Sequence, residues 1–163
     1  PGVQARIVDG EIRLKGPQCF EGYLDPSLDE KAFDEDGWFR SGDLGEIDGD
    51  GNVFVTGRVK DVVIRNAENI SALEIEDVLL RHPAIADVAV IGLPDARTGE
   101  RVCAVIVPEG DAALDVATIG AHCREAGLAR YKCPEQVELV AGLERNAMGK
   151  LLKQKIREEI SKG

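Results

Sequence analysis

The sequence predicts an α+β protein in which a segment of short strands precedes a compact α/β unit. Residues 1–57 consist of short apolar stretches separated by glycine-containing turns. Residues 71–83 carry a helix-capping pattern, and Val- and Ile-rich stretches alternate with helical periodicities in the rest of the chain. Apolar residues make up 44% of the 163 residues, which is enough for a packed core. The pattern changes near residue 58, where we expect the two parts to meet.

Residues 3–57 have the pattern of strands joined by turns. "ARIV" and "EIRLK" flank Asp9-Gly10, a dipeptide typical of two-residue hairpins, and "GWFRSGDLGEID" and "NVFVTGR" flank the turn "GDG". We expect no helix here, because the pieces are short and bounded by glycines. These strands would make a poor core by themselves. We therefore expect them to complete a sheet whose remainder lies elsewhere, and the 163 residues to be part of a longer protein.

The second part is expected to be a central sheet of about three strands with flanking helices. "SALEIEDVLLRHP" predicts a helix in which Ser71 is the N-cap, Glu74 completes a capping box and Pro83 stops the helix. "KDVVIR" is a short strand, and "IADVAVIGLPD", "ERVCAVIVPEG" and "EQVELV" predict the strands of the sheet. Helices are expected at "DVATIGAHCREAGL" and "GKLLKQKIREEI", the latter with Leu152, Ile156 and Ile160 at i+4 spacing.

Charge and cysteine content narrow the class of protein. The formal charge of −10 argues against binding to nucleic-acid phosphates or to an anionic membrane surface. No apolar run approaches the roughly 18 residues of a membrane-spanning helix. The cysteines form no C-x-x-C pair and are accompanied by only two histidines, so we expect free thiols, a reducing compartment (the cytoplasm) and no metal site. These residues are Cys19, Cys103, Cys123, Cys133, His82 and His122.

Two glycine-rich motifs are excluded by their spacing. A nucleotide P-loop needs G-x-x-x-x-G-K-[ST], but the glycine before Gly149 is Gly142, and Leu151 stands where the hydroxyl is required. "DGDGN" at residues 48–52 resembles the start of a calcium loop. Val53 and Val59 occupy the positions at which that loop needs Gly and Glu, so a hairpin turn is expected instead.

Three further stretches occur in order: "GWFRSGD" (37–43), "GRVKDVVIRNAENIS" (57–71) and "RNAMGK" (145–150). Together they resemble the C-terminal part of the AMP-forming acyl-CoA ligases, in the adenylate-forming superfamily that includes luciferases and peptide-synthetase adenylation domains. The likeness runs from "GEIRLKGPQCFEGYLD" over nearly the whole chain. It implies that residues 1–57 end a large N-terminal domain, that residues 58–61 are a hinge, and that residues 62–163 form a C-terminal lid domain.

The resemblance also implies roles for individual residues. Asp43 matches the acidic residue that binds the ribose hydroxyls, and Arg58 matches the arginine that reaches the ribose and phosphate side. Lys60 matches the hinge position, and Lys150 matches the lysine that enters the site for adenylation. A carboxylate accepts bonds from both ribose hydroxyls. A lysine that meets the α-phosphate only in the closed arrangement stabilises the transition state selectively.

Asn66, Ala67 and Glu68 match the loop that lines the pantetheine channel during thioester formation. Many members of the family have glycine at the position of Ala67, and the extra methyl group is expected to be tolerated if φ there is negative. Glu144 is a second departure, because proline is common before "RN". It bears on the stiffness of the loop rather than on the chemistry.

Each of these residues also has a purely structural interpretation. Asp43 would cap a turn after Gly42, and Arg58 and Lys60 would be surface charges on a strand. Lys150 would be a solvated residue in the first turn of a helix, where positive charge is mildly unfavourable. "AENIS" would serve only as the entry to the capped helix.

The resemblance implies the C-terminal part of a ligase that converts a fatty or related carboxylic acid, ATP and CoA into acyl-CoA, AMP and pyrophosphate. ATP or AMP and Mg²⁺ would bind mostly through the N-terminal domain, which is the expected partner of this segment, and the segment would be inactive alone. One alternative is an adenylation domain that loads a carrier protein, although the acidic charge disfavours docking of an acidic carrier. Another is a non-catalytic interaction module that retains the lid fold.

Overall fold

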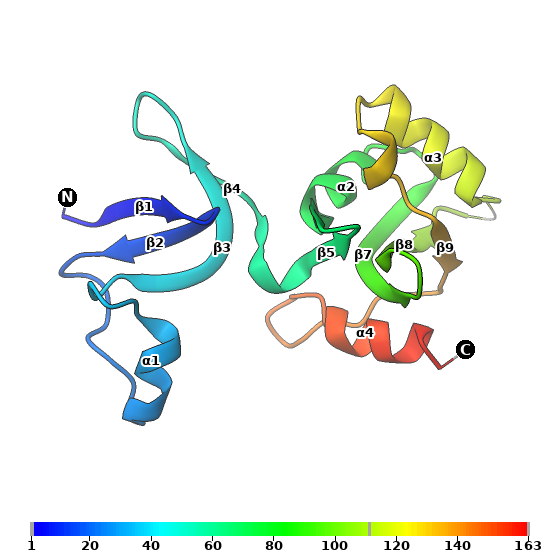
Figure 1. The fold of residues 1–163 in the computed structure, drawn as a ribbon. Helices are drawn as coiled ribbons and strands as arrows, with labels where there is room; N and C mark the ends of the chain where they lie inside the picture. Colours follow the sequence, from blue (N-terminus) through cyan, green and yellow to red (C-terminus); the bar gives the residue numbers. More distant parts are fainter. Residues whose placement is uncertain (1, 111, 163) are drawn as a thin grey trace. The chain divides into compact units, whose positions relative to one another are not determined.

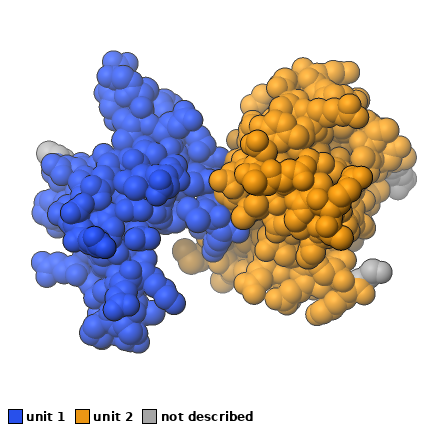
Figure 2. Space-filling view, in the orientation of Figure 1, with its two compact units in different colours: residues 1–60 blue, residues 61–163 orange. Residues whose placement is uncertain are grey.

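The structure, a computed structural model, describes residues 2–110 and 112–162. The chain divides into two compact units, Pro1–Lys60 and Asp61–Gly163, which Figure 2 distinguishes by colour. The boundary between them falls within the predicted hinge at residues 58–61. Hinge motion at these residues stays a prediction. The fold is α+β, as expected, and each unit contains its own sheet (Figure 1).

The first unit is a four-stranded antiparallel sheet in the order β1-β2-β3-β4. Its strands are β1 (Gln4–Val8), β2 (Glu11–Lys15), β3 (Phe39–Ile47) and β4 (Val53–Arg58). The predicted β1–β2 hairpin is present, and Asp9 and Gly10 have φ values of 53° and 81°. Positive φ at both turn residues gives a twist that matches that of the strands.

The connection between β2 and β3 contains a 3₁₀ helix, Pro26–Leu28, and a short α-helix, α1 (Asp29–Ala32). The expectation that this part of the chain has no helix was therefore wrong. Asp25 accepts a hydrogen bond from the Ser27 N–H at 3.0 Å, and Pro26 supplies a preset φ at the first helical position. A local capping signal sufficed for two short turns despite the surrounding glycines.

An ionic network takes the place of a large apolar core in the first unit. Ile12 is the only buried apolar side chain among its described residues. The carboxylate of Asp34 instead accepts bonds from Arg6 and Arg13, both at 2.7 Å, and from the backbone N–H of Trp38 at 2.9 Å. Burial raises the pKa of Asp34, but these donors lower it further and leave it well below its usual range. The resulting stabilisation is present above the ordinary pKa of aspartate and is lost as the pH falls through the lowered value.

The second unit contains five strands rather than the three or so that were predicted. The strands are β5 (Val62–Arg65), β6 (Glu68–Ser71), β7 (Ile85–Asp95), β8 (Gly99–Pro108) and β9 (Gln136–Leu139). The order is β6-β5-β8-β7, and β9 pairs in parallel with β8. β5 corresponds to the short strand predicted at "KDVVIR", whereas β6 was not predicted, and the two form a hairpin that joins β8 where Arg65 pairs with Gly99.

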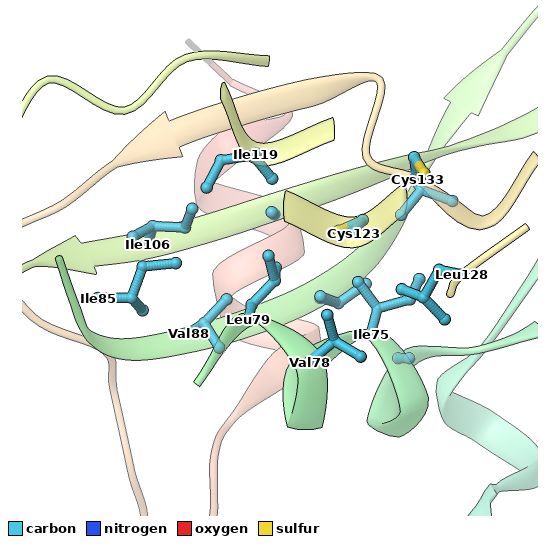
Figure 3. Close-up of a cluster of buried hydrophobic side chains, with 14 of the residues drawn as sticks. Ile75, Val78, Leu79, Ile85, Val88, Ile106, Ile119, Cys123, Leu128 and Cys133 are labelled. Atoms are coloured by element: carbon cyan, nitrogen blue, oxygen red, sulfur yellow. The ribbon is translucent and has the colours of Figure 1, made fainter. Parts of the chain in front are cut away.

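The long β7–β8 ladder is covered on both faces. Val88 and Val90 of β7 belong to one apolar cluster, whereas Ala89 and Ile91 belong to a second. Because successive side chains of a strand point to opposite faces, this division explains why both strands are almost continuously apolar in sequence. Figure 3 shows the first cluster, in which side chains such as Leu79 and Ile119 pack with the strand residues Val88 and Ile106.

Two helices cover the first face and one covers the second. α2 (Ala72–Leu79) begins at the predicted cap, where Ser71 Oγ accepts the Glu74 N–H at 3.3 Å, and α3 (Val116–Glu125) is capped by Asp115. α4 (Lys153–Ile160) packs on the second face through Ile156. No helix in the described part of the chain has the length and apolar character needed to cross a membrane.

α4 begins later than the sequence analysis predicted. Its first residue is Lys153, and the predicted start at Gly149 lies in a loop. Arg145 pairs with Leu151 in an isolated antiparallel bridge, and the Leu152 N–H donates to Glu144 O at 3.0 Å. These backbone contacts close a tight loop and prevent a helical start before residue 153.

The division into two units leads to a prediction for limited proteolysis. We expect early cleavage near residues 58–61 to leave a protected fragment that begins close to Asp61, because the second unit has its own two-sided core. N-terminal sequencing and mass spectrometry of the fragments check this. A single protected species that spans residues 1–163, with no cut near the boundary, would contradict it.

Candidate functional site

The segment that carries Asp43 is shaped by a left-handed glycine in strand β3. Gly42 has φ of 73°, and its N–H donates to Glu11 Oε1 at 3.1 Å. Ser41 Oγ donates to Ile12 O at 2.6 Å and accepts the Asp43 N–H at 3.0 Å. The serine that stands in this motif therefore holds the backbone on both sides of Gly42, and it fixes the position of Asp43 relative to β2.

The structure brings Asp43 and Arg58 together. They are opposite each other in the β3–β4 register, and Arg58 Nε lies 2.9 Å from Asp43 Oδ1. The side chain of Arg58 is 41% exposed and that of Asp43 is 28% exposed, so both charges are accessible to solvent. A carboxylate beside a guanidinium presents acceptors and donors side by side, an arrangement that suits the hydroxyls of a sugar and a neighbouring phosphate.

Lys60 lies in a one-turn 3₁₀ helix, Val59–Asp61, that spans the boundary between the units. Its side chain is exposed and forms no ion pair with the described residues. The purely structural interpretation placed Lys60 on a strand, and this was wrong.

Lys150 lies on a compact loop, residues 145–151, that we call the Lys150 loop. Asn146 organises the loop, since its Oδ1 accepts the N–H groups of Met148 at 3.0 Å and Lys150 at 2.9 Å. The Asn146 N–H also donates to Lys150 O at 2.9 Å, and Gly149 adopts φ of 79°. Lys150 is exposed and precedes the helix by three residues, so the interpretation that it belongs to the first helical turn was wrong.

Asn66 and Ala67 form the two-residue turn of the β5–β6 hairpin, in which Arg65 pairs with Glu68. Their φ values are 51° and 63°. The condition under which the methyl group of Ala67 was expected to be tolerated, a negative φ, is therefore not met, because a two-residue hairpin of this twist needs positive φ at both positions. Asparagine tolerates this conformation, but alanine is strained in it by about 1–2 kcal/mol.

A cavity of about 670 Å³ in the second unit was missed by the sequence analysis. Arginines from three separate segments line it, together with Tyr131 and Glu135, and these are Arg65, Arg124 and Arg130. Arg65 is held by Glu135 through two bonds of 2.8 Å, whereas Arg124 and Arg130 form no ion pair with the described residues. No short sequence motif connects these positions, so only the fold could reveal the cluster.

The described residues offer no group of three or more His, Cys, Asp or Glu side chains that could hold a metal ion. The four cysteines are free, in agreement with the prediction from their spacing. Burial raises the pKa of the Cys103 thiol to about 12, so this group is unreactive as a nucleophile.

This combination of a capped α/β unit, an exposed lysine loop and a carboxylate–guanidinium pair agrees with the comparisons with known proteins. Residues 74–150 match the family described as the AMP-binding enzyme C-terminal domain. The chain belongs to the adenylate-forming enzymes of the acyl-CoA ligase and aryl-AMP ligase family, and it corresponds to their C-terminal part.

Three relatives illustrate the match. The medium-chain fatty-acid–CoA ligase of Escherichia coli is 39% identical, over 98% of this chain and 30% of its own length. The salicyl-AMP ligase/salicyl-S-ArCP synthetase of Mycobacterium tuberculosis is 40% identical, over 93% of this chain and 27% of its own length. The crystal structure of ATP-bound MatB from Rhodopseudomonas palustris superposes with a TM-score of 0.89 at 39% identity, covering 98% of this chain and 34% of MatB. The chain thus spans about a third or less of these relatives.

The strained turn at Ala67 leads to a prediction for stability. We expect Ala67→Gly to raise the free energy of unfolding of the second unit by about 0.5–1 kcal/mol, because relief of strain exceeds the added freedom of the unfolded chain. Ala129, with φ of −60°, provides the matched control, and Ala129→Gly should lower the same free energy. Urea unfolding of the three proteins checks both. A loss of stability in Ala67→Gly would contradict the strain.

Proposed function

We propose that this chain is the C-terminal part of an ATP-dependent, AMP-forming acyl-CoA ligase. The whole enzyme would convert a fatty or related carboxylic acid, ATP and CoA into acyl-CoA, AMP and pyrophosphate. The observation that carries the proposal is the Lys150 loop, which presents an exposed lysine from a hydrogen-bonded turn rather than from the surface of a helix. This is the geometry expected of a group that must reach a phosphate from outside its own domain.

In this proposal the residues act in two places. Lys150 would stabilise the negative charge that develops on the α-phosphate as the carboxylate attacks, with pyrophosphate as the leaving group. Asp43 would accept bonds from the ribose hydroxyls, and Arg58 would hold both Asp43 and the ribose or phosphate oxygens. Lys60 would lie at the hinge that lets the second unit exchange roles between adenylation and thioester formation.

The arginine-lined cavity favours CoA over a carrier protein as the acceptor. Arg124 and Arg130 are available to an anion, and guanidinium groups bind phosphates well through paired N–H donors. CoA carries three phosphates on its nucleotide half, whereas the pantetheine arm of a carrier protein has no nucleotide. The cavity is also next to the hairpin that carries Asn66, Ala67 and Glu68, since Arg65 lines it and precedes the turn. That hairpin would guide the pantetheine arm.

A carrier-loading enzyme is the second candidate, because the salicyl-AMP ligase/salicyl-S-ArCP synthetase is about as similar as the CoA ligases are. A non-catalytic module with this fold is the third. The three candidate functions place different requirements on Lys150 and on the arginine-lined cavity, so one set of variants distinguishes them.

The first test uses a chimaera in which residues 1–163 replace the aligned segment of the E. coli medium-chain fatty-acid–CoA ligase. Pyrophosphate release with a medium-chain acid measures adenylation, and CoA consumption from preformed acyl-adenylate measures thioester formation. We expect Lys150→Ala to slow adenylation by about 100- to 1000-fold, the loss typical of one donor to a developing anion, and to spare thioester formation. Equal slowing of both steps would assign Lys150 to the fold instead, and no effect on either step would favour the non-catalytic module.

The second test concerns the acceptor. In the same chimaera we expect Arg124→Ala and Arg130→Ala each to raise the KM for CoA about tenfold, since a charge-assisted hydrogen bond contributes about 1.5–3 kcal/mol. The KM for free pantetheine, which lacks the nucleotide, should not change. Arg81→Ala is the control, because Arg81 is exposed and lies outside the cavity. Equal KM values for CoA in all the proteins would contradict a nucleotide site in the cavity.

A further inference from the structure

Two ion pairs join the Lys150 loop and the start of α4 to the body of the second unit. The first involves Arg145, at the beginning of the loop. Its Nη2 lies 2.9 Å and 2.7 Å from the two carboxylate oxygens of Asp87 on β7, and its Nη1 donates to Gly149 O at 2.9 Å. A single guanidinium therefore connects strand β7 with the far side of the loop, one residue before Lys150.

The second ion pair involves Lys153, the first residue of α4. Its Nζ lies 2.7 Å from Glu76 Oε1, and the same oxygen accepts the backbone N–H of Val90 at 2.6 Å. Glu76 is on α2 and Val90 is on β7. The side chains of Glu76 and Lys153 are only 9% and 13% exposed, so the contact lies in the interior and has little competition from water.

Both ends of the segment that carries Lys150 are therefore held by contacts with the same strand, β7. Asp87 and Val90 are three residues apart on β7, and they fix Arg145 directly and Lys153 through Glu76. Lys150 lies between the two anchored residues. Asn146 fixes the turn through hydrogen bonds within the loop, and the contacts at both ends fix the loop to β7. Together they orient the backbone at Lys150.

The buried Glu76–Lys153 pair is not mainly a source of stability. Burial raises the pKa of the Glu76 carboxyl, and the attraction of Lys153 and the Val90 N–H does not fully offset this. The folded chain thus binds this proton more tightly than the unfolded chain does. The free energy of unfolding therefore falls as the pH rises from 4.5, the ordinary pKa of the glutamate carboxyl, through the raised pKa of Glu76, because the folded chain must then hold a charged carboxylate in its interior. A buried ion pair of this kind contributes a defined geometry more than it contributes free energy.

We propose that Glu76 and Asp87 are positioning residues for Lys150. Acting through Lys153 and Arg145, they hold the Lys150 loop in one shape, so that adenylation does not have to order the loop before its lysine meets the phosphate. Neither residue touches a substrate in this scheme. The claim that this shape matters for catalysis rests on the proposed function of Lys150. The claim that the ion pairs maintain the shape does not depend on that function.

The first experiment measures the shape in the 163-residue chain alone, by ¹⁵N relaxation of the Met148 and Lys150 amides. We expect rigid order parameters near about 0.85 in the unchanged chain, and values below about 0.6 in Asp87→Ala and in the double variant Glu76→Gln/Lys153→Met. The double variant keeps an acceptor for the Val90 N–H and leaves no buried unpaired charge, so it is expected to fold. Unchanged amide shifts along β7 and β8 report that the sheet is intact. Rigid amides in the variants, with the sheet intact, would overturn the proposal.

The second experiment measures adenylation in the chimaera. We expect Asp87→Ala and Glu76→Gln/Lys153→Met to lower the kcat for pyrophosphate release on the order of 100-fold, with the KM for ATP and the rate of thioester formation unchanged. Lys153→Arg, which keeps the charge opposite Glu76, should retain most of the rate that Glu76→Gln/Lys153→Met loses. Lys155→Met is the matched control, because Lys155 is on the same helix but forms an exposed pair with Glu144.

Lys150→Ala separates the two hypotheses. If it slows adenylation while the variants of the ion pairs do not, the positioning role is wrong and the proposed function stands. If Lys150→Ala itself has no effect, the proposed function fails, and the relaxation experiment still decides whether the ion pairs order the loop.

Discussion

The β7–β8 ladder is the constraint on which the arrangement of the second unit depends. Its strands are paired over nearly their whole length, and their alternating side chains enter two separate apolar clusters. One cluster fixes α2 and α3 on the first face, and the other fixes α4 on the second. Each element of the second unit that carries a candidate residue is attached to this ladder. The β5–β6 hairpin joins at Gly99, η3 (Arg130–Lys132) leads into β9 beside β8, and the Lys150 loop is connected to β7 through Asp87. A rigid centre therefore supports short polar loops, which is the usual division between scaffold and function.

The polar segments share a second feature, which is backbone in the left-handed region. Gly42 beside Asp43, Ala67 in the hairpin and Gly149 beside Lys150 all have positive φ. Each of these conformations turns the chain sharply. Beside Gly42 and Gly149 a neighbouring side chain, Ser41 or Asn146, accepts the N–H of the residue that follows the glycine. Glycine accepts this geometry freely, and the alanine at position 67 does not. Strain is thus concentrated in the turn that we propose guides the pantetheine arm, whereas the Lys150 loop has glycine at its positive φ and is held by hydrogen bonds.

The two units are stabilised by different kinds of contact. The second relies on apolar burial, and the one buried carboxylate among its described residues, Glu76, lies where α2, β7 and α4 meet. The first has one buried apolar side chain among its described residues and relies on the Asp34 network, with the Arg6 guanidinium 4.4 Å above the Trp38 ring. Several of its large apolar side chains, including Leu24 and Phe54, are exposed. This agrees with a segment that forms part of a larger structure in the relatives, of which the chain spans about a third or less.

Local patterns in the sequence determined most of the elements and the family. The cap at Ser71, the hairpin at Asp9-Gly10 and the alternating strands were predictable because each depends on neighbours in the chain. The three motifs likewise identified Asp43, Arg58 and Lys150 as candidates, and the roles of these residues stay predictions. Tertiary structure decided what depends on distant contacts. The start of α4 was set by the Arg145–Leu151 bridge, and the sign of φ at Ala67 was set by hairpin pairing. The arginine cavity brings Arg65 to Arg124 and Arg130, which are 59 and 65 positions away, and the Glu76–Lys153 pair spans 77 positions. No periodicity or local propensity encodes such proximity, because it arises only when the sheet and its helices pack.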